Sequence, residues 1–304
     1  MEPTSSIQSG EPWRVRVQTW MEVFASPERR IELVAGMTLL LLLLYSEPVW
    51  YLEVGVYGLS ISALLHRPLL RKPWFWLLLA LFLAAGHARI WFQVDNHKYL
   101  ITYWCLAFGL SMAAADPLRA LRTNARLLIG LAFLFAVVAK LLSPDYMSGD
   151  FFDSLLVMDN RFSTVTSFLG GIPAQDLQLG RLLRTDLLIF GDLTVPIDVV
   201  DSPRLQLMTQ VLTWWTLFIE AIVAVLFLWP QDRGPSRWRD LALVLFILTT
   251  YPVAPVIGFA WVLAAMGTAQ STTPRAGFGP VLYVAAYIFT MLISYVPLAG
   301  LLSS

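Results

Sequence analysis

Apolar runs of helix length recur along the whole chain and constrain its fold more than any other feature. A helix that crosses a bilayer needs about 20 predominantly apolar residues, and most of these runs approach or exceed that length. Hydrophobic residues make up 57% of the 304 positions and charged residues only 14%. We therefore expect an all-α fold, a polytopic integral membrane bundle of about 7–9 transmembrane helices in contact with the lipid bilayer.

The runs differ in length and in how cleanly they are bounded. In chain order they cover residues 31–45, 49–65, 74–92, 99–114, 127–142, 208–229, 241–266 and about 281–302. The first two are short and are separated by Glu47-Pro48, which predicts a hairpin of paired helices. The run 241–266 contains Pro252 and Pro255, so it predicts either one broken helix or two short segments.

Basic residues gather beside the runs and predict the orientation of the chain. Four clusters fall on one side if each clean run crosses once: Arg14, Arg16, Arg29 and Arg30; His66, Arg67, Arg71 and Lys72; Arg119, Arg122 and Arg126; and Arg233, Arg237 and Arg239. By the positive-inside rule that side is cytoplasmic, which places the N-terminus there. Residues 1–30, with Trp13, Trp20 and Phe24 on one helical stripe, predict an N-terminal interfacial helix, and residues 31–304 the transmembrane domain.

A long acidic segment, residues 143–207, then lies on the extracytoplasmic side. It holds nine Asp against four Arg and also contains apolar patches such as Phe151-Phe152. A connection this long is far more than two spans require, so we expect a structured lid over the bundle. A protein or peptide substrate is a candidate partner at this segment.

Two ionisable residues within the apolar runs are the strongest candidates for chemistry. Lys140 lies about one turn from the end of the run 127–142, and Glu220 lies near the middle of the run 208–229. Charged groups inside a bilayer are costly and commonly functional. The structural alternatives stay open: Lys140 can extend to the interface along its alkyl stem, and Glu220 can serve only as a buried ion-pair partner.

Other polar residues fall at the same predicted depth, in the outer half of the bundle. They are His87, Arg89, Asn96, His97 and, at the proline break, Tyr251. We expect them to line one outward-facing polar pocket beneath the acidic segment. Packing, interfacial anchoring and turn formation are the ordinary alternatives for these residue types.

Several classes of function lack support in the sequence. A net charge of zero provides no basic surface for nucleic acid. The single cysteine, Cys105, rules out a disulfide framework, and no metal-ligand spacing, phosphate loop or hydrolase triad stands out. We therefore expect no bound metal and no nucleic-acid partner.

Two short motifs resemble a known family of membrane proteins. Residues 95–100 (DNHKYL) precede a span, and residues 139–149 (AKLLSPDYMSG) close a later one after a basic loop that contains Arg122-Thr123-Asn124-Ala125. Their order and spacing resemble the membrane domain of vitamin K-dependent gamma-carboxylase, which is shared with the wider HTTM-type family. The resemblance covers about 60 residues and, beyond them, the pattern of spans.

The resemblance implies a quinol chemistry and assigns residues to it. Lys140 matches the lysine that acts as general base on vitamin K hydroquinone, which oxygen then converts to an epoxide in a reaction coupled to glutamate carboxylation. The implied cofactor is reduced vitamin K or a menaquinone-type quinol, with Asn96 and His97 shaping its pocket. Glu220 would be the counter-charge or a proton relay. The span that carries a histidine in the carboxylase reads Thr249-Thr250-Tyr251-Pro252 here, and a chain of 304 residues leaves no room for the carboxylase's lumenal domain.

Two further functions remain open from the sequence. One is a non-catalytic membrane assembly or maturation factor whose acidic segment docks another protein. The other is a small-molecule transporter that uses the break at Pro252 and Pro255.

Overall fold

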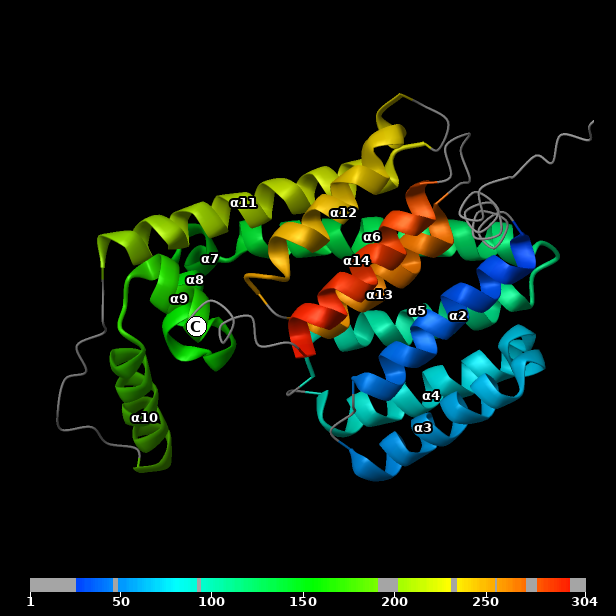
Figure 1. The fold of residues 1–304 in the computed structure, drawn as a ribbon, viewed down its shortest axis with the longest axis horizontal. Coiled ribbons are helices and arrows are strands. Elements are labelled where there is room, and N and C mark those ends of the chain that lie inside the picture. The colour runs from blue at the N-terminus through cyan, green and yellow to red at the C-terminus, as the bar shows by residue number, and fades with distance from the viewer. Residues whose placement is uncertain are drawn as a thin grey trace, which may run out of the picture. The chain divides into compact units, whose positions relative to one another are not determined.

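The structure is a computed structural model that describes residues 26–45, 49–91, 94–190, 202–230, 234–254, 256–271 and 278–295, with side chains given for all of these except 183–190, 278, 294 and 295. Across these ranges the chain forms thirteen α-helices joined by turns and short 3-10 helices, and it contains no strand (Figure 1). The expected all-α fold is confirmed.

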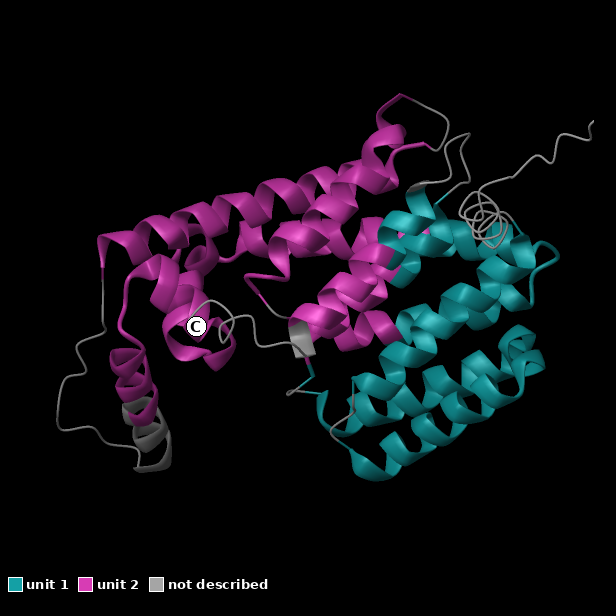
Figure 2. Cartoon of the chain, viewed as in Figure 1, with its two compact units in different colours: residues 1–94, 102–125, 265–284 teal, residues 95–101, 126–264, 285–304 magenta. Residues whose placement is uncertain are grey.

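The chain divides into two compact units (Figure 2). Unit 1 comprises residues 1–94, 102–125 and 265–284, and unit 2 comprises residues 95–101, 126–264 and 285–304. Each unit thus gathers segments that are far apart in the sequence.

Unit 1 is built on three neighbouring helices and an aromatic core. Its first elements are α2 (Pro27–Leu44), α3 (Trp50–Leu65), η1 (Arg67–Arg71) and α4 (Pro73–Arg89), followed by most of α5 (Asn96–Met112). The rings of Trp76 and Phe108 stack with centroids 3.9 Å apart, and the Trp104 indole donates a hydrogen bond of 2.9 Å to the Thr38 hydroxyl. The Trp76 indole likewise donates to the Leu70 carbonyl at 2.8 Å, so the apolar interior of unit 1 accommodates both of these large side chains with their polar atoms paired.

The N-terminal region differs from the expectation at one residue. The predicted interfacial helix at residues 1–30 falls outside the described residues except for its last five, and α2 already begins at Pro27. Arg30, which the sequence places in a cytoplasmic flanking cluster, is buried at 1% exposure and donates to the Ser271 carbonyl at 2.7 Å. A hydrogen bond to a backbone carbonyl partly offsets the burial of this guanidinium, and the charge pattern of the sequence does not reveal such a contact.

Unit 2 holds the longest helices and the acidic segment. Its elements, some of which begin or end in unit 1, are α6 (Pro117–Leu142), α7 (Pro144–Ser148), α8 (Asp150–Met158), η3 (Asn160–Phe162), α9 (Ser163–Gly170), α10 (Ala174–Phe190), α11 (Pro203–Leu228), η4 (Gly234–Trp238), α12 (Arg239–Thr250), α13 (Ile257–Gln270) and α14 (Phe278–Tyr295).

Two helices in the described part of the chain, α6 and α11, are long and apolar enough to cross a membrane, with 26 residues each. The run at 241–266, for which the sequence leaves two readings, forms two separate helices, α12 and α13. With 14 residues, α13 rises about 21 Å, which is less than the ~30 Å of a bilayer's hydrocarbon core. The apolar pattern thus predicts helices well, but the prolines make several of them short.

The helices α6 and α11 run antiparallel and approach closely. A Cβ added to Gly130 would lie 2.8 Å from the side chain of Leu228, so only glycine fits there without a shift. Near the same end, the guanidinium of Arg126 donates to the carbonyls of Phe227 at 3.2 Å and Trp229 at 3.1 Å. A cation at this position satisfies carbonyls at the end of α11 and complements its dipole.

The acidic segment 143–207 folds into helices α7 to α10 and leads into α11. It has a small core of its own, formed by Leu156, Val157, Phe162, Ile172, Leu177 and Leu205. Arg181 on α10 ties this region together by donating to the carbonyls of Val157 at 3.0 Å and Asp159 at 3.1 Å. In its described residues, 143–190 and 202–207, the segment is therefore structured rather than a tether, and its extracytoplasmic location stays a prediction.

Candidate functional site

Lys140 and Glu220 form an ion pair within unit 2. The Lys140 ammonium, in the last turn of α6, donates a hydrogen bond to Oε1 of Glu220 on α11. The two side chains are 21% and 9% exposed. Removing either partner from such a pair leaves the other charge poorly solvated, so the two residues depend on each other.

A polar stripe on α11 leads to this pair. Thr209, Thr213, Thr216 and Glu220 follow one another at spacings of four, three and four residues, which places them on one helical face. All four are buried. The Thr213 and Thr216 hydroxyls return hydrogen bonds to their own helix, Thr213 to the Thr209 carbonyl at 2.9 Å and Thr216 to the Leu212 carbonyl at 2.7 Å. The sequence analysis missed this stripe, although its spacing in the run 208–229 would have revealed it.

Tyr146 on α7 is a second residue that sequence reasoning missed. Its phenol is hydrogen-bonded to the Thr216 hydroxyl, and since Thr216 donates to the Leu212 carbonyl at 2.7 Å, Tyr146 is the donor to Thr216. The Lys140 ammonium lies 5.2 Å from the centre of the Tyr146 ring, within the range of a cation–π contact. Burial raises the pKa of Tyr146 to about 12, so the phenol stays neutral at ordinary pH.

Local sequence explains how Tyr146 reaches this place. Ser143 caps α7 by accepting from the Tyr146 backbone N–H at 3.3 Å, and Pro144 occupies the first helical turn, where no N–H is required. Gly149 ends the helix with φ of +95°, a left-handed conformation that favours glycine. A Cβ at Gly149 would also lie 3.1 Å from the Thr209 methyl group. The turn from α6 into α7 therefore packs directly onto α11.

Tyr251 lies at the break between α12 and α13 and is 5% exposed. Its ring meets Phe246 edge-on at 5.8 Å and Phe259 at 6.2 Å between centroids. Among the described residues, neither the Tyr251 hydroxyl nor Oε2 of Glu220 has a hydrogen-bond partner.

His97 approaches the same aromatic cluster from α5. It is 7% exposed, and its ring stacks on Phe259 at 6.3 Å with an interplanar angle of 27°. Its Nε2 lies 4.0 Å from Oδ2 of Asp95. Phe259 thus contacts both His97 and Tyr251, while Asn96 at the start of α5 is exposed.

The remaining two predicted residues, His87 and Arg89, belong to unit 1. His87 is 3% exposed, and its Nδ1 lies 3.1 Å from the Thr102 hydroxyl. Arg89 is exposed at the end of α4. Within unit 2 the structure therefore brings Lys140 and Glu220 together, while Tyr251 and His97 share contacts with Phe259.

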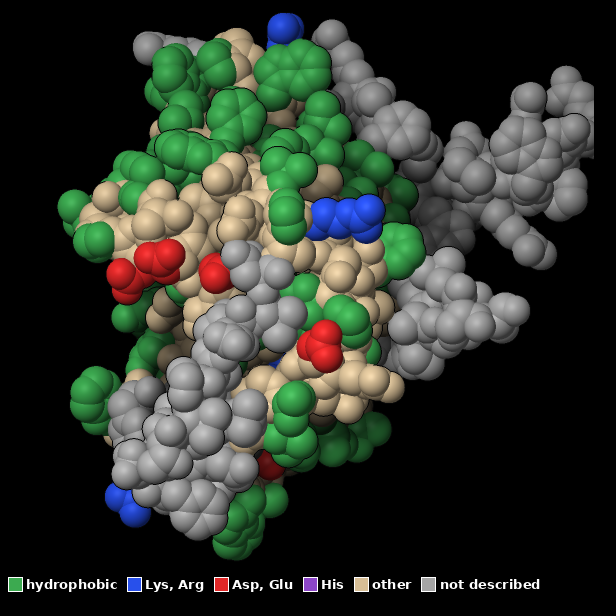
Figure 3. Space-filling view, turned by 90° about the vertical axis from the view of Figure 1, so that its left-hand side faces the viewer, with side chains coloured by type: hydrophobic (Ala, Val, Ile, Leu, Met, Phe, Trp, Pro, Cys, Tyr) green, Lys and Arg blue, Asp and Glu red, His purple; other side chains and the backbone are tan. Residues whose placement is uncertain are grey.

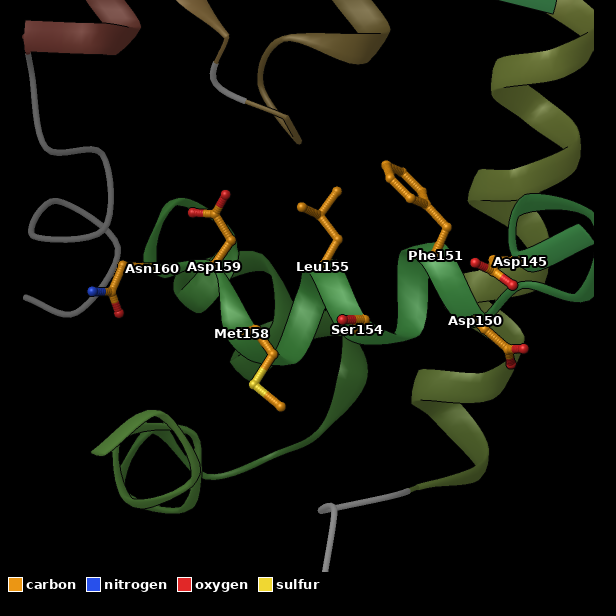
Figure 4. A pocket seen from close by; sticks show the side chains of 8 residues that line it. All are labelled: Asp145, Asp150, Phe151, Ser154, Leu155, Met158, Asp159 and Asn160. Atoms are coloured by element: carbon orange, nitrogen blue, oxygen red, sulfur yellow. The ribbon is translucent and has the colours of Figure 1, made fainter. Parts of the chain in front are cut away.

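A pocket of about 720 Å³ lies along α8 in unit 2. Its lining combines carboxylates with apolar side chains: Asp145, Asp150, Phe151, Ser154, Leu155, Met158, Asp159 and Asn160. Phe151, Leu155 and Asp159, spaced four residues apart, project from one side of α8 (Figure 4). None of the predicted site residues lines this pocket, although its Phe151 ring lies 5.4 Å from that of Tyr146.

The surface in Figure 3 shows hydrophobic side chains beside separate acidic ones. In the ranges the structure describes, no group of three or more His, Cys, Asp or Glu residues is placed to hold a metal ion.

Comparison of the chain with protein-family models, with curated proteins and with solved structures finds no match in any of the three. The resemblance to the HTTM-type family consequently rests on its two motifs.

Proposed function

We propose that this protein is an HTTM-like membrane protein that binds a lipophilic quinol and removes a phenolic proton from it, with the Lys140–Glu220 pair as the base. The observation that carries this proposal is the pair itself, because its partners come from the two described helices that are long and apolar enough to cross a membrane. A bilayer span commonly retains such costly charges for a function. An isoprenoid quinol would reach the pair from the lipid phase.

The proposal includes an arrangement in the membrane. Helices α2 to α6 and α11 to α14 would lie in the bilayer, with the N-terminus and the basic clusters on the cytoplasmic side. Segment 143–207 covers the opposite side. Helices too short to cross alone would then be buried against neighbours or be accommodated by local thinning of the bilayer.

The chemistry needs one proton acceptor and an orienting shell. The pair removes a phenolic proton from the quinol, and the resulting anion is stabilised by the Lys140 charge. Oxygen then reacts with the activated ring, and one hydroquinone and one dioxygen give one epoxide and one water. Tyr251 and His97, which share contacts with Phe259, would orient the ring, and Asn96 would lie at its entrance.

Aerobic turnover of menadiol, a naphthohydroquinone without an isoprenoid tail, tests this function in protein reconstituted in lipid nanodiscs. Lys140→Gln should lower turnover by about 10²-fold or more, as expected for the loss of acid–base catalysis. Arg119→Gln is the matched control, since Arg119 is an exposed cation on the same helix. Wild-type protein that neither binds nor oxidises menadiol would exclude the proposed function.

The pocket on α8 favours a second candidate, a docking factor for a cationic amphipathic segment of another protein. Its carboxylates and its apolar side chains Phe151, Leu155 and Met158 suit such a partner. A Lys- and Leu-rich helical peptide should then bind wild-type protein and fail to bind the Ser154→Arg variant. A docking factor would retain this binding in Lys140→Gln, whereas peptide binding unaffected by Ser154→Arg would argue against it.

A further inference from the structure

A second set of contacts links the Lys140 ammonium to α11, besides its hydrogen bond to Glu220. The ammonium lies over the ring of Tyr146, 5.2 Å from the ring centre. The phenol of Tyr146 is in turn hydrogen-bonded to the Thr216 hydroxyl. Thr216 precedes Glu220 by four residues, about one helical turn, on the same buried face of α11. Three side-chain contacts and one turn of α11 therefore join these four residues in a closed circuit within unit 2.

The fold holds the Tyr146 ring in a fixed place. Tyr146 is 4% exposed, and the centre of its ring lies 5.4 Å from that of Phe151 and 5.6 Å from that of Phe152. The short helix α7 that carries Tyr146 is capped at its start by the Ser143 hydroxyl and ends at Gly149 in the left-handed conformation. A buried ring that is packed against other rings and hydrogen-bonded at its hydroxyl has little freedom to turn away.

The Lys140 side chain, by contrast, has an exposed alternative. It lies in the last turn of α6 and is 21% exposed, and its flexible alkyl stem can carry the ammonium out toward water. An ammonium is attracted to the face of an aromatic ring. The Tyr146 ring therefore favours the conformation in which Lys140 meets Glu220 and opposes the one that would separate the pair.

We propose that Tyr146 is a positioning residue: its ring holds the Lys140 ammonium against Glu220, and its hydrogen bond to Thr216 holds the ring. The inference rests on the proposed function, in which the Lys140–Glu220 pair is the base. Tyr146 itself exchanges no proton with the quinol, because its hydroxyl proton is already donated to Thr216. Without the ring, a smaller fraction of the protein would hold the assembled pair. The quinol would still bind, so kcat would fall with little change in KM.

Amine labelling of the protein in lipid nanodiscs tests the positioning without any quinol. Acetic anhydride acetylates lysine side chains, and mass spectrometry compares Lys140 with Lys72, which is exposed. An amine held at a carboxylate and over a ring should react slowly. Tyr146→Leu removes the ring and should speed the labelling of Lys140 relative to Lys72 by about tenfold. Tyr146→Phe keeps the ring and loses one hydrogen bond, so it should speed the labelling by about threefold.

Phe152→Leu is the matched control for loss of a buried ring. Phe152 belongs to the same aromatic cluster and is 7% exposed, and its ring lies against Tyr146. This variant should leave the labelling of Lys140 as in wild type. Thr216→Val is a milder second variant, because it removes the acceptor of the Tyr146 hydrogen bond and keeps every ring; it should speed the labelling by about threefold. Unchanged labelling in both Tyr146→Leu and Thr216→Val, or equal acceleration in Phe152→Leu, would overturn the inference.

Menadiol kinetics then connect the positioning to the proposed reaction. In Tyr146→Leu, kcat should fall by about tenfold while KM stays near that of wild type, and Tyr146→Phe should restore kcat to within about threefold. A raised KM with unchanged kcat would assign Tyr146 to quinol binding and contradict the positioning role. Protein that does not turn over menadiol but shows the expected order of Lys140 labelling would exclude the proposed function and still support the placement of Lys140 by Tyr146.

Discussion

The Lys140 ammonium and the Glu220 carboxylate meet inside unit 2, one from each of the two helices that, in the described part of the chain, are long enough and apolar enough to cross a membrane. Because α6 and α11 run antiparallel, the pair joins them at a point well removed from the close contact of Gly130 with Leu228. The two ends of this helix pair are therefore joined differently: Gly130 packs on Leu228 near the Arg126 hydrogen bonds at one end, and the ion pair lies at the other. The chemistry proposed above uses the end with the ion pair.

The pair predicts a strongly non-additive response to mutation. Lys140→Met and Glu220→Leu should each lower the free energy of unfolding by about 3 kcal/mol or more, because each leaves a poorly solvated charge. The double variant should lie within about 1 kcal/mol of wild type, since it buries two apolar groups instead. Chemical unfolding in detergent micelles measures all four free energies. A double variant that loses the sum of the two single losses would show that the partners act independently.

Much of the helical architecture follows from the sequence. Every apolar run contains a helix, and the break after Thr250 coincides with the prolines at 252 and 255. Helices rather than strands could be predicted because the apolar runs are long and are bounded by prolines and polar turns. The burial of Arg30 was not readable, since its partner is a backbone carbonyl 241 positions away in the chain.

Part of the candidate site could also be predicted from the apolar pattern of the sequence. Lys140 and Glu220 stand out because each is a charge in an apolar run, and hydropathy alone selects them. Hydropathy does not select Tyr146 and Thr216, because tyrosine and threonine are common in helices near membranes. Their importance comes from the fold, which places the Tyr146 phenol on the Thr216 hydroxyl and the Tyr146 ring beside Lys140.

The buried phenol of Tyr146 predicts a loss of stability at alkaline pH. The pKa rises from 10.0 to about 12 on folding, chiefly because of burial. Above pH 10 the unfolded chain therefore gives up a proton that the folded chain retains. This contribution to the free energy of unfolding is constant below pH 10 and falls between pH 10 and about 12, by up to about 1.4 kcal/mol per pH unit.

The comparison of wild type with Tyr146→Phe isolates this effect. Other groups that titrate in the same range contribute to both profiles and cancel in the difference. The stability difference between the two proteins should shrink steadily from pH 10 toward pH 12, as measured by chemical unfolding. Parallel profiles across this range would mean that the phenol is not buried in the folded protein.

The close approach of α6 and α11 predicts that replacing Gly130 by alanine lowers the free energy of unfolding, although alanine normally favours a helix over glycine. Gly130→Ala would place a methyl group 2.8 Å from the Leu228 side chain and 3.3 Å from its backbone nitrogen. Overpacking of this kind costs about 1–3 kcal/mol, which exceeds the ~1 kcal/mol that alanine gains over glycine in a helix. We expect a net loss of about 1 kcal/mol in thermal or chemical unfolding. Gly180→Ala on α10 meets nothing within 4 Å and should be neutral or stabilising.

Crossing of the membrane by α6 can be tested directly with single cysteines. The helix has 26 residues and rises about 39 Å, which is enough to span a ~30 Å hydrocarbon core. Ala115, ahead of the helix, and Ser154 on α8 are both exposed, while the native Cys105 is buried. In a Cys105→Ser background, a membrane-impermeant maleimide should label Ser154→Cys on intact cells and Ala115→Cys only in inverted vesicles. Labelling of both positions from the same side would show that α6 does not cross the membrane. Lys140 would then not be a charge in a membrane-spanning helix.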